Sequence, residues 1–359
     1  MSVRSFNPAL QAHFKEFPRA HYQYGFRNVI TRSACQQILD KLRLKEKYPN
    51  SEGRLDIIDI FSGHGLLSTM INYELKPRNH LVIDHSKEPC QVWQDRIEYL
   101  KKHTQNRENF IFSPLSGYFW STYDKLITED KIVSPSFQPR SKIHDELLIV
   151  ANLTSSKYGE SLLAQWLMCV GFQNWLQKYG RVRMVITAPE ETATKFLAGP
   201  SYKKRNRTAM KRAVLTDAHL IAVTKPQTVR SAGFGYDPRL LIKDQPALLP
   251  SSAVAPSTSR LAVLEFVPKD IDYIDTQELS YVTQALALRL NTSVLETLSL
   301  MAPGAATDLA PLIPRETLKK NFREITDDEI MIIYNAYHNW AFKPKFEETI
   351  VTELDEPEH

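Results

Sequence analysis

The chain has 359 residues, of which 43% are hydrophobic and 24% charged, a composition typical of a globular protein with one large domain and a smaller one. Its formal net charge of +4 is mild, so nucleic-acid binding must be inferred from where the charges lie. Cys35, Cys90 and Cys169 are far apart, which indicates a reducing compartment and predicts no metal site. The apolar runs have the length of strands, so no transmembrane helix is expected.

The start of the chain is basic and poor in acids. Residues 1–27 carry Arg4, Lys15, Arg19 and Arg27 against the single acid Glu16. This pattern is compatible with import into an organelle, although many cytosolic proteins begin in the same way, and it contains no secretory apolar segment.

Helices and buried strands are predicted to alternate up to about residue 225. Helical periodicity over 33–45 precedes a strand at 55–60, a glycine turn and a helix from Leu66. Further strands are predicted at 79–86, 109–114, 146–153 and 181–189, and one long helix at 161–180 that Gly180 closes. Strands rich in Ile, Leu and Val between helices predict an α/β fold whose mainly parallel sheet is covered on both faces.

The sequence pattern changes after residue 225. Prolines and the segment "LLPSSAVAPSTSR" predict a loop or extended linker over about 225–260, followed by a last strand at 261–268. From 276 the pattern is helical, and Thr326 with Glu329 predicts a capping box. Residues 347–359 carry six acids and no Lys or Arg, typical of a mobile tail. We therefore expect an α/β domain over 1–275, a helical domain over 276–346 and an acidic tail.

The strand near Asp59 leads into the glycine loop Phe61-Ser62-Gly63-His64-Gly65. Glycine lets backbone N–H groups approach a ligand closely, although Ser68 stands where a dinucleotide fingerprint would need a third glycine. Asp84 ends the next strand, where a carboxylate can accept both ribose hydroxyls, and Asn152 ends the fourth. Together these residues predict a nucleoside-shaped pocket at the carboxyl edge of the sheet, with a plain strand–helix turn as the alternative.

Several stretches carry a family resemblance: "YGFRNVI", "WSTYDKLI", "LLIVANLT", "LLAQWL", "NWLQKYGRVRM", "FLAGP" and "NWAFKPKF". The chain resembles the ribosomal RNA adenine dimethyltransferase family, which implies a class I S-adenosylmethionine-dependent methyltransferase (Rossmann-like) fold with a small α-helical C-terminal domain. Within that family it is similar to the fungal mitochondrial transcription initiation factors, the specificity partners of mitochondrial RNA polymerase. The resemblance implies a vestigial S-adenosylmethionine pocket formed by Val29, Asp59, Gly63, Gly65, Asp84, Ser113 and Asn152.

Three departures from the family pattern argue against methyl transfer. Tyr24-Gly25 is followed by Phe26-Arg27 in place of the polar cofactor-facing pair, and Ser113 stands where an acid is usual. Asn152-Leu153 is followed by Thr154-Ser155 in place of Pro and an aromatic. Stacking a flipped base is worth about 1–3 kcal/mol, so losing that platform removes the grip on the target. We predict no catalytic residues and no required cofactor, and residual S-adenosylmethionine binding stays open.

Two segments are candidates for binding nucleic acid. The run "SYKKRNRTAMKR" is expected to project from the glycine-loop edge and bind phosphates, unless it is only a solvated face. "GYFWSTY" is expected to stack an unpaired base, unless its aromatics lie in the core. The candidate residues are Tyr118, Trp120, Lys178, Arg181, Arg183, Lys203, Lys204, Arg205, Arg207, Lys211 and Arg212.

The leading hypothesis is a non-enzymatic initiation factor of the mitochondrial matrix, a monomer until it joins the mitochondrial RNA polymerase. Its partners would be that polymerase and melted promoter DNA, through the non-template strand, with RNA left open and no membrane. The alternatives are an rRNA adenine N6-dimethyltransferase and a structural RNA-binding protein of the mitoribosome. The motif losses favour the first over the second.

Overall fold

The computed structural model describes residues 2–14, 26–155, 158–225 and 235–344, so the acidic tail and the Tyr24-Gly25 pair lie outside it. A sheet of eight strands runs through the larger part of the molecule in the order β4-β3-β2-β5-β6-β10-β7-β8. All neighbouring pairs are parallel except those that β10 makes with β6 and β7. The strands are β2 (Asp56–Ile60), β3 (Asn79–Ile83), β4 (Phe110–Ser113), β5 (Ile143–Asn152), β6 (Arg181–Pro189), β7 (Thr216–Thr224), β8 (Ala247–Leu249) and β10 (Leu261–Pro268).

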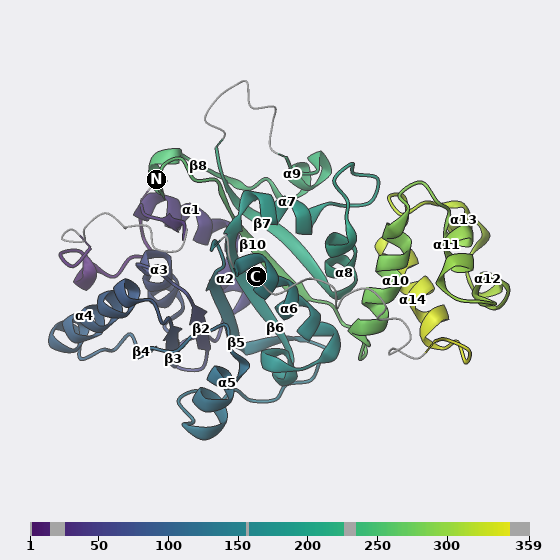
Figure 1. Cartoon of the computed structure of the whole chain (residues 1–359). Coiled ribbons are helices and arrows are strands. Elements are labelled where there is room, and N and C mark those ends of the chain that lie inside the picture. Colours follow the sequence, from purple (N-terminus) through teal and green to yellow (C-terminus); the bar gives the residue numbers. More distant parts are fainter. Residues whose placement is uncertain (1, 15–25, 156–157, 226–234, 345–359) are drawn as a thin grey trace.

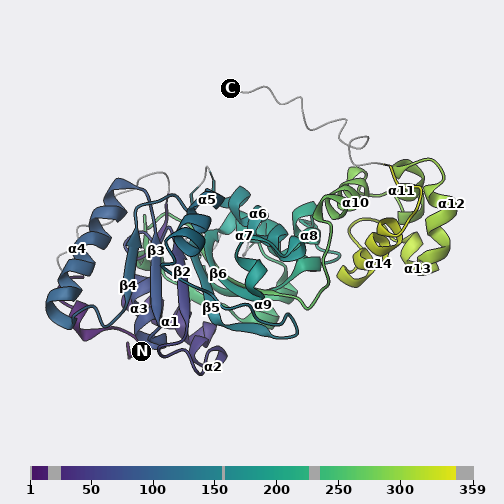
Figure 2. The ribbon, with the colours of Figure 1, turned by 90° about the horizontal axis from the view of Figure 1, so that it is seen from below.

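Helices cover both faces of this sheet (Figures 1 and 2). One face carries α1 (Arg32–Leu42), α2 (Leu44–Lys47), α3 (Leu66–Leu75) and α4 (Lys87–Thr104). The other carries α5 (Trp120–Tyr123), the π-helix η2 (Asp124–Glu129), α6 (Gly159–Phe172), the 3-10 helix η3 (Trp175–Tyr179), α7 (Glu190–Leu197) and α8 (Arg207–Leu215). The predicted α/β class with a covered, mainly parallel sheet is confirmed.

The run of apolar residues in β2 is unbroken because both of its faces are covered. Ile57 packs in the core on the α1 and α3 side, and Ile58 packs in the core on the α6 side. Successive strand side chains point to opposite faces, so both positions must be apolar. Burying each such side chain stabilises the fold by about 1.5–3 kcal/mol.

A group of helices lies to one side of the sheet in Figure 2: α10 (Thr276–Leu288), α11 (Val294–Met301), α12 (Ala305–Leu309), α13 (Arg315–Lys319) and α14 (Asp327–His338). Helices α10 and α14 pack against α8. The predicted capping box at the start of α14 is confirmed, since Thr326 and Glu329 bond to each other's backbone N–H. Short 3-10 helices complete the chain: η1 (Pro8–Leu10), η4 (Ser251–Ala253) and η5 (Ala310–Leu312).

The expectation of a plain linker over 225–260 is wrong for the part that the structure describes. This part contains α9 (Pro238–Asp244), the sheet strand β8, and β9 (Val254–Ala255), which pairs with β1 (Asn28–Val29). Pro246 and Pro250 flank β8, and an edge strand of three residues tolerates prolines just outside its ladder.

The single helix predicted over 161–180 is in fact two. Helix α6 ends at Phe172, where Gln173 adopts a left-handed conformation (φ 51°) and donates its N–H to the carbonyl of Cys169. The chain then turns so that Trp175 stacks on Trp166, with ring centroids 4.7 Å apart and planes at 16°. None of the helices in the described ranges is long and apolar enough to cross a membrane.

Candidate functional site

The glycine loop packs tightly against the protein's own side chains. Gly63 and Gly65 have φ values of +57° and +69°, a region that favours glycine. A Cβ at Gly65 would clash with the indole of Trp93, and one at Gly63 with the amide of Asn28. The indole N–H of Trp93 donates to Ser62 Oγ at 2.8 Å. The close approach that these glycines permit is therefore made by α4 and by the segment around residue 28.

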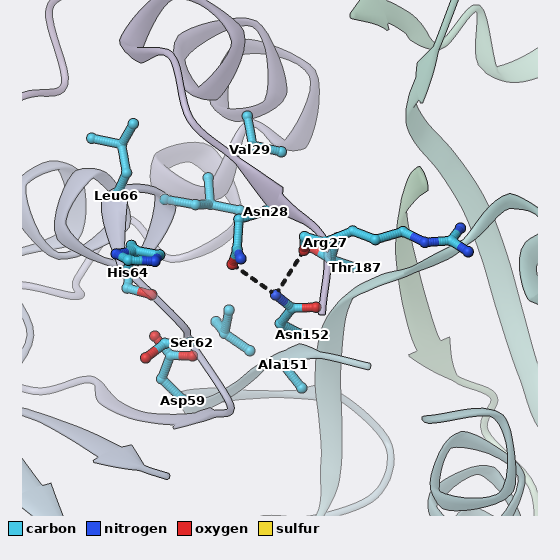
Figure 3. Close-up of a pocket in the computed structure, with 14 residues that line it drawn as sticks. Arg27, Asn28, Val29, Asp59, Ser62, His64, Leu66, Ala151, Asn152 and Thr187 are labelled. Atoms are coloured by element: carbon cyan, nitrogen blue, oxygen red, sulfur yellow. Dashed lines mark hydrogen bonds between the residues drawn. The ribbon is translucent and has the colours of Figure 1, made fainter. Parts of the chain in front are cut away.

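Asn152 lies at the end of β5, and its whole side-chain amide is engaged (Figure 3). Nδ2 donates to the carbonyl of Arg27 at 3.0 Å and to Asn28 Oδ1 at 3.1 Å. Oδ1 accepts from the N–H of Thr154 at 3.2 Å and from its hydroxyl at 2.6 Å. The backbone N–H of Arg27 also donates to Thr154 Oγ1 at 2.7 Å. We call these contacts the β5 clamp, because they hold residues 27–28 across the end of the strand.

The cavity that remains beside this clamp measures about 40 Å³. Sites for small molecules measure about 300–1,000 Å³, and one water occupies about 30 Å³ of liquid. Asp59, Gly65 and Asn152 line it, together with Val29 and the side chain of His64, whereas the guanidinium of Arg27 points away (Figure 3). In this structure the residues do not fit S-adenosylmethionine, because the space lies below the range of small-molecule sites and the Asn152 amide is already bonded.

The remaining predicted cofactor residues lie at the same strand ends but do not line this cavity. Asp84 is buried and accepts from the N–H of Ser86 at 2.9 Å, and burial raises its pKa. Ser113 is buried and accepts the N–H of Asp84 through its carbonyl at 3.3 Å. Gly63 is likewise absent from the lining, whereas Asp59 accepts from His80 Nε2 at 3.2 Å. Within the described ranges no group of His, Cys, Asp and Glu could hold a metal ion.

Four aromatic side chains gather on the surface near the start of α5 and α6, and we call Tyr118, Phe119, Trp120 and Tyr158 the aromatic surface. Phe119 is 59% exposed, Trp120 43% and Tyr158 46%. The ring of half-buried Tyr118 lies 5.6 Å from Phe119 and 5.3 Å from Tyr158. Sequence reasoning missed Tyr158, although an aromatic three residues after Ser155 was a signal. The family pattern has an aromatic directly after Asn152-Leu153, and in this chain the next aromatic, Tyr158, lies slightly further along.

The expectation that the whole basic run faces solvent is wrong. Arg205 is buried and bonds to Asp327 of α14 at 3.2 Å, and burial lowers its pKa to about 10. Arg207 donates to Gln284 at 2.8 Å and Lys211 to Ser280 at 3.3 Å, both on α10. Arg212 donates to the carbonyls of Phe196 and Thr216 at 3.0 and 3.3 Å.

Half of the six cations of the run therefore join α8 and the loop before it to the C-terminal helices, because these cations find partners there. Lys203 and Lys204 are the exposed members, and no ion pair or hydrogen bond of either ammonium group is found within the described part of the chain. These two lysines keep the predicted role in phosphate binding.

The three cations before the run are also placed differently from expectation. Arg181 and Arg183 lie at the start of β6, away from the carboxyl ends that hold the glycine loop. Arg183 pairs with buried Glu265 at 2.5 Å, and Arg181 donates to the carbonyls of Pro268 and Arg140 at 2.9 and 3.1 Å. Lys178 alone is exposed, with Nζ 5.3 Å from the centre of the Tyr179 ring.

Known proteins resemble this chain along most of its length. It is 28% identical over 332 residues to the Saccharomyces cerevisiae protein named Mitochondrial transcription factor 1, covering 92% of this chain and 93% of that protein. The protein of the same name from Lachancea kluyveri is 29% identical over 326 residues, covering 90% and 91%.

The fold also matches a solved enzyme and a family description. A dimethyladenosine transferase from Plasmodium falciparum superimposes with a TM-score of 0.55 at 10% identity, over 86% of this chain and 96% of that one. This confirms the methyltransferase-like fold and carries no information on activity. The model of the ribosomal RNA adenine dimethylase family matches residues 18–337. The chain belongs to the ribosomal RNA adenine dimethylase family.

Proposed function

We propose that this chain is a mitochondrial transcription initiation factor of the matrix that binds the mitochondrial RNA polymerase, helps to recognise and open promoter DNA, and transfers no methyl group. Its relatives named Mitochondrial transcription factor 1 match more than nine tenths of it, which supports both the role and the compartment. It requires no cofactor.

The observation that carries this proposal is the β5 clamp. A methyl donor at this edge would have to displace residues 27–28 and break four hydrogen bonds that they make with Asn152 and Thr154. At about 0.5–1.5 kcal/mol for each bond, that costs roughly 2–6 kcal/mol before any contact with the donor forms. The cavity of about 40 Å³ offers no compensating contacts.

The aromatic surface supports the second half of the proposal. Trp120 and Phe119 are exposed at the same end of the sheet, where an unpaired base could stack on them. One stacked base returns about 1–3 kcal/mol, which is comparable with about 1.4 kcal/mol lost on opening one base-pair step. Capturing bases of the non-template strand would therefore stabilise the open promoter.

The test combines two assays on the purified full chain. With mitochondrial RNA polymerase it should support run-off transcription from a duplex promoter, and with S-adenosylmethionine and a small-subunit rRNA hairpin it should yield no dimethyladenosine above buffer background. Dimethyladenosine formation would identify an rRNA methyltransferase instead. RNA binding without any effect on the polymerase would identify a structural protein of the mitoribosome.

A further inference from the structure

The glycine loop is filled from within by two of the chain's own side chains. A Cβ built on Gly63 would lie 2.5 Å from Asn28 Oδ1, and one built on Gly65 would overlap the indole of Trp93. Glycines at the start of such a helix let backbone N–H groups approach a bound ligand. Here an asparagine amide and a tryptophan ring take up the space that the two glycines leave.

Asn28 is held in this position on two sides (Figure 3). Its Oδ1 accepts from Asn152 Nδ2 at 3.1 Å, so it bonds to an amide at the end of β5. Its backbone belongs to β1, which pairs with β9 through Asn28 opposite Ala255. The N–H of Ile30 extends this pairing by donating to the carbonyl of Ala253 at 2.8 Å. The β5 clamp and the β1–β9 ladder therefore fix the asparagine together.

Arg27 ties the same segment to α7 and to the residue before β10. Its NH1 donates to the carbonyl of Arg260 at 2.5 Å, and its guanidinium lies 3.4 Å from the carboxylate of Glu191. The guanidinium points away from the cavity, so these contacts hold the segment and leave the cavity uncharged by arginine (Figure 3). The Glu191 side chain is 65% exposed, so the ion pair is weak and the bond to the Arg260 carbonyl is the firmer contact.

Polar groups expected to bind a nucleoside nevertheless remain at the strand ends. Asp59 lines the small cavity, and its Oδ1 is buried without a hydrogen bond to any residue of the described ranges. Such an oxygen is an exception, because buried polar atoms are paired in the great majority of cases. Asp84 and Asn152 also lie at this edge of the sheet. The feature that is missing is space, since the cavity measures about 40 Å³.

We propose that Asn28, with the backbone of residues 27–30, is an intramolecular plug in a nucleoside site that the chain still outlines. The plug excludes the ligand by conformation, because apparent affinity falls in proportion to the fraction of molecules whose site is open. The competing explanation is that substitutions have abolished the site itself, in which case displacing the plug uncovers nothing. The inference goes beyond the proposed role in transcription and does not require the polymerase.

The experiment measures binding of S-adenosylmethionine to the full chain by titration calorimetry. Asn28→Ala removes the side chain of the plug, and Thr154→Ala removes the hydroxyl that holds the backbone of Arg27 through two hydrogen bonds. Affinity should rise in each variant and by about tenfold or more in the double variant, because the open state becomes more populated. The matched control Asn79→Ala loses an amide bonded to Asp56 at the opposite edge of the sheet, and its affinity should equal that of the original protein.

Hydrogen exchange locates the bound ligand. Exchange of the amides of residues 61–66 should slow when S-adenosylmethionine is added to the double variant, because these N–H groups then face the ligand. The same amides should show no change in the original protein. A gain in affinity without slower exchange in this loop would place the ligand elsewhere and overturn the plug.

Two further results would also overturn it. One is an unchanged affinity in a double variant whose melting temperature is close to that of the original protein, since the site would then be absent and not covered. The other is an equal gain in Asn79→Ala, which would show general loosening of the sheet. If the double variant does not fold, Asn28→Ala alone decides by the same criteria. Run-off transcription tests the proposed function separately and can succeed whether or not the plug exists.

Discussion

At the scale of single residues, exposure separates the side chains that are free to bind a partner from those that hold the fold. Lys203, Lys204 and Trp120 face solvent, whereas Arg183 and Arg205 are buried against carboxylates. A buried guanidinium that has a carboxylate partner cannot also bind phosphate without losing that partner. Only the first group is therefore expected to affect nucleic-acid binding directly.

Trp120→Ala should impair initiation on a duplex promoter far more than on a template whose start region is already mismatched. A captured base returns about 1–3 kcal/mol, and pre-melted DNA does not need that return to open. Run-off transcription on the two templates measures the difference. Because Trp120 is 43% exposed, its truncation should cost less than the roughly 3–5 kcal/mol of a core tryptophan.

Tyr73→Ala is the control for that substitution, since Tyr73 is 38% exposed on α3, across the sheet from α5. It should leave both templates equally active. Equal defects of Trp120→Ala on both templates, together with a lowered melting temperature, would place Trp120 among the structural residues.

Replacing Lys203 and Lys204 together by Gln should weaken DNA binding and reduce the slope of log K against log salt by up to about two. Each phosphate contact contributes about 0.9 to that slope on duplex DNA. Neutralising Lys45 and Lys101, which are exposed on α2 and α4, is the matched control. Titration at several salt concentrations gives the slope, and an unchanged value for Lys203 and Lys204 would show a merely solvated pair.

At the scale of elements, the hydrogen bonds in the first turn of α14 make the stability of the folded protein depend on pH. Glu329 accepts from the N–H of Thr326, from the hydroxyl of Thr317 and from Lys320. Burial alone would raise its pKa, but these hydrogen bonds outweigh burial and lower the pKa from 4.5 to about 2. A pKa depressed on folding stabilises the folded state above the unfolded value, and that contribution is lost as pH falls from about 4.5 to 2.

Glu329→Gln should therefore reduce the free energy of unfolding at pH 7 by about 1–3 kcal/mol. The difference from the original protein should shrink as pH falls from about 4.5 to 2, since Glu329 is protonated in the unfolded state over that range and becomes neutral in the folded state only at its lower end. Urea unfolding at a series of pH values measures it. Glu296→Gln, in the exposed capping box of α11, is the comparison and should show a smaller effect; a pH-independent Glu329 difference would contradict the mechanism.

At the scale of the whole molecule, α8 connects the sheet domain to the C-terminal helices. Arg205, in the loop before α8, bonds to Asp327, and Arg207 and Lys211 on α8 itself bond to α10. Arg205 and Asp327 are buried unequally: the Arg205 side chain is 1% exposed, and that of Asp327 is 32% exposed. Removing one member therefore has a different consequence from removing the other.

Asp327→Asn should destabilise the protein more than Arg205→Met. The first leaves a buried guanidinium without its charge partner, which costs about 3–5 kcal/mol when burial is complete, and the second leaves a carboxylate that water can reach. The double variant should be about as stable as Arg205→Met alone. A double-mutant cycle in urea measures this coupling, and additive effects would show that the pair does not join the domains.

Periodicity and local chemistry in the sequence by themselves determined the α/β class, the glycine loop with its strand–helix turn, and the α14 capping box. These features depend on residues close in sequence or on which face of an element is apolar, both of which the pattern records. The local pattern failed at the end of α6, where stacking of Trp175 on Trp166 favours a left-handed turn over a continued helix.

Only the tertiary structure decided which polar groups are free to bind a partner. Asn152 meets Arg27 across 125 positions of sequence, and Arg205 meets Asp327 across 122. No periodicity records such pairs, because the order of strands and the packing of helices bring them together. The same folding that forms the β5 clamp at the carboxyl edge of the sheet leaves Trp120 and Tyr158 exposed. It also forms a cavity of about 330 Å³ that Trp120 helps to line, so the chain's exposed surfaces follow from its topology.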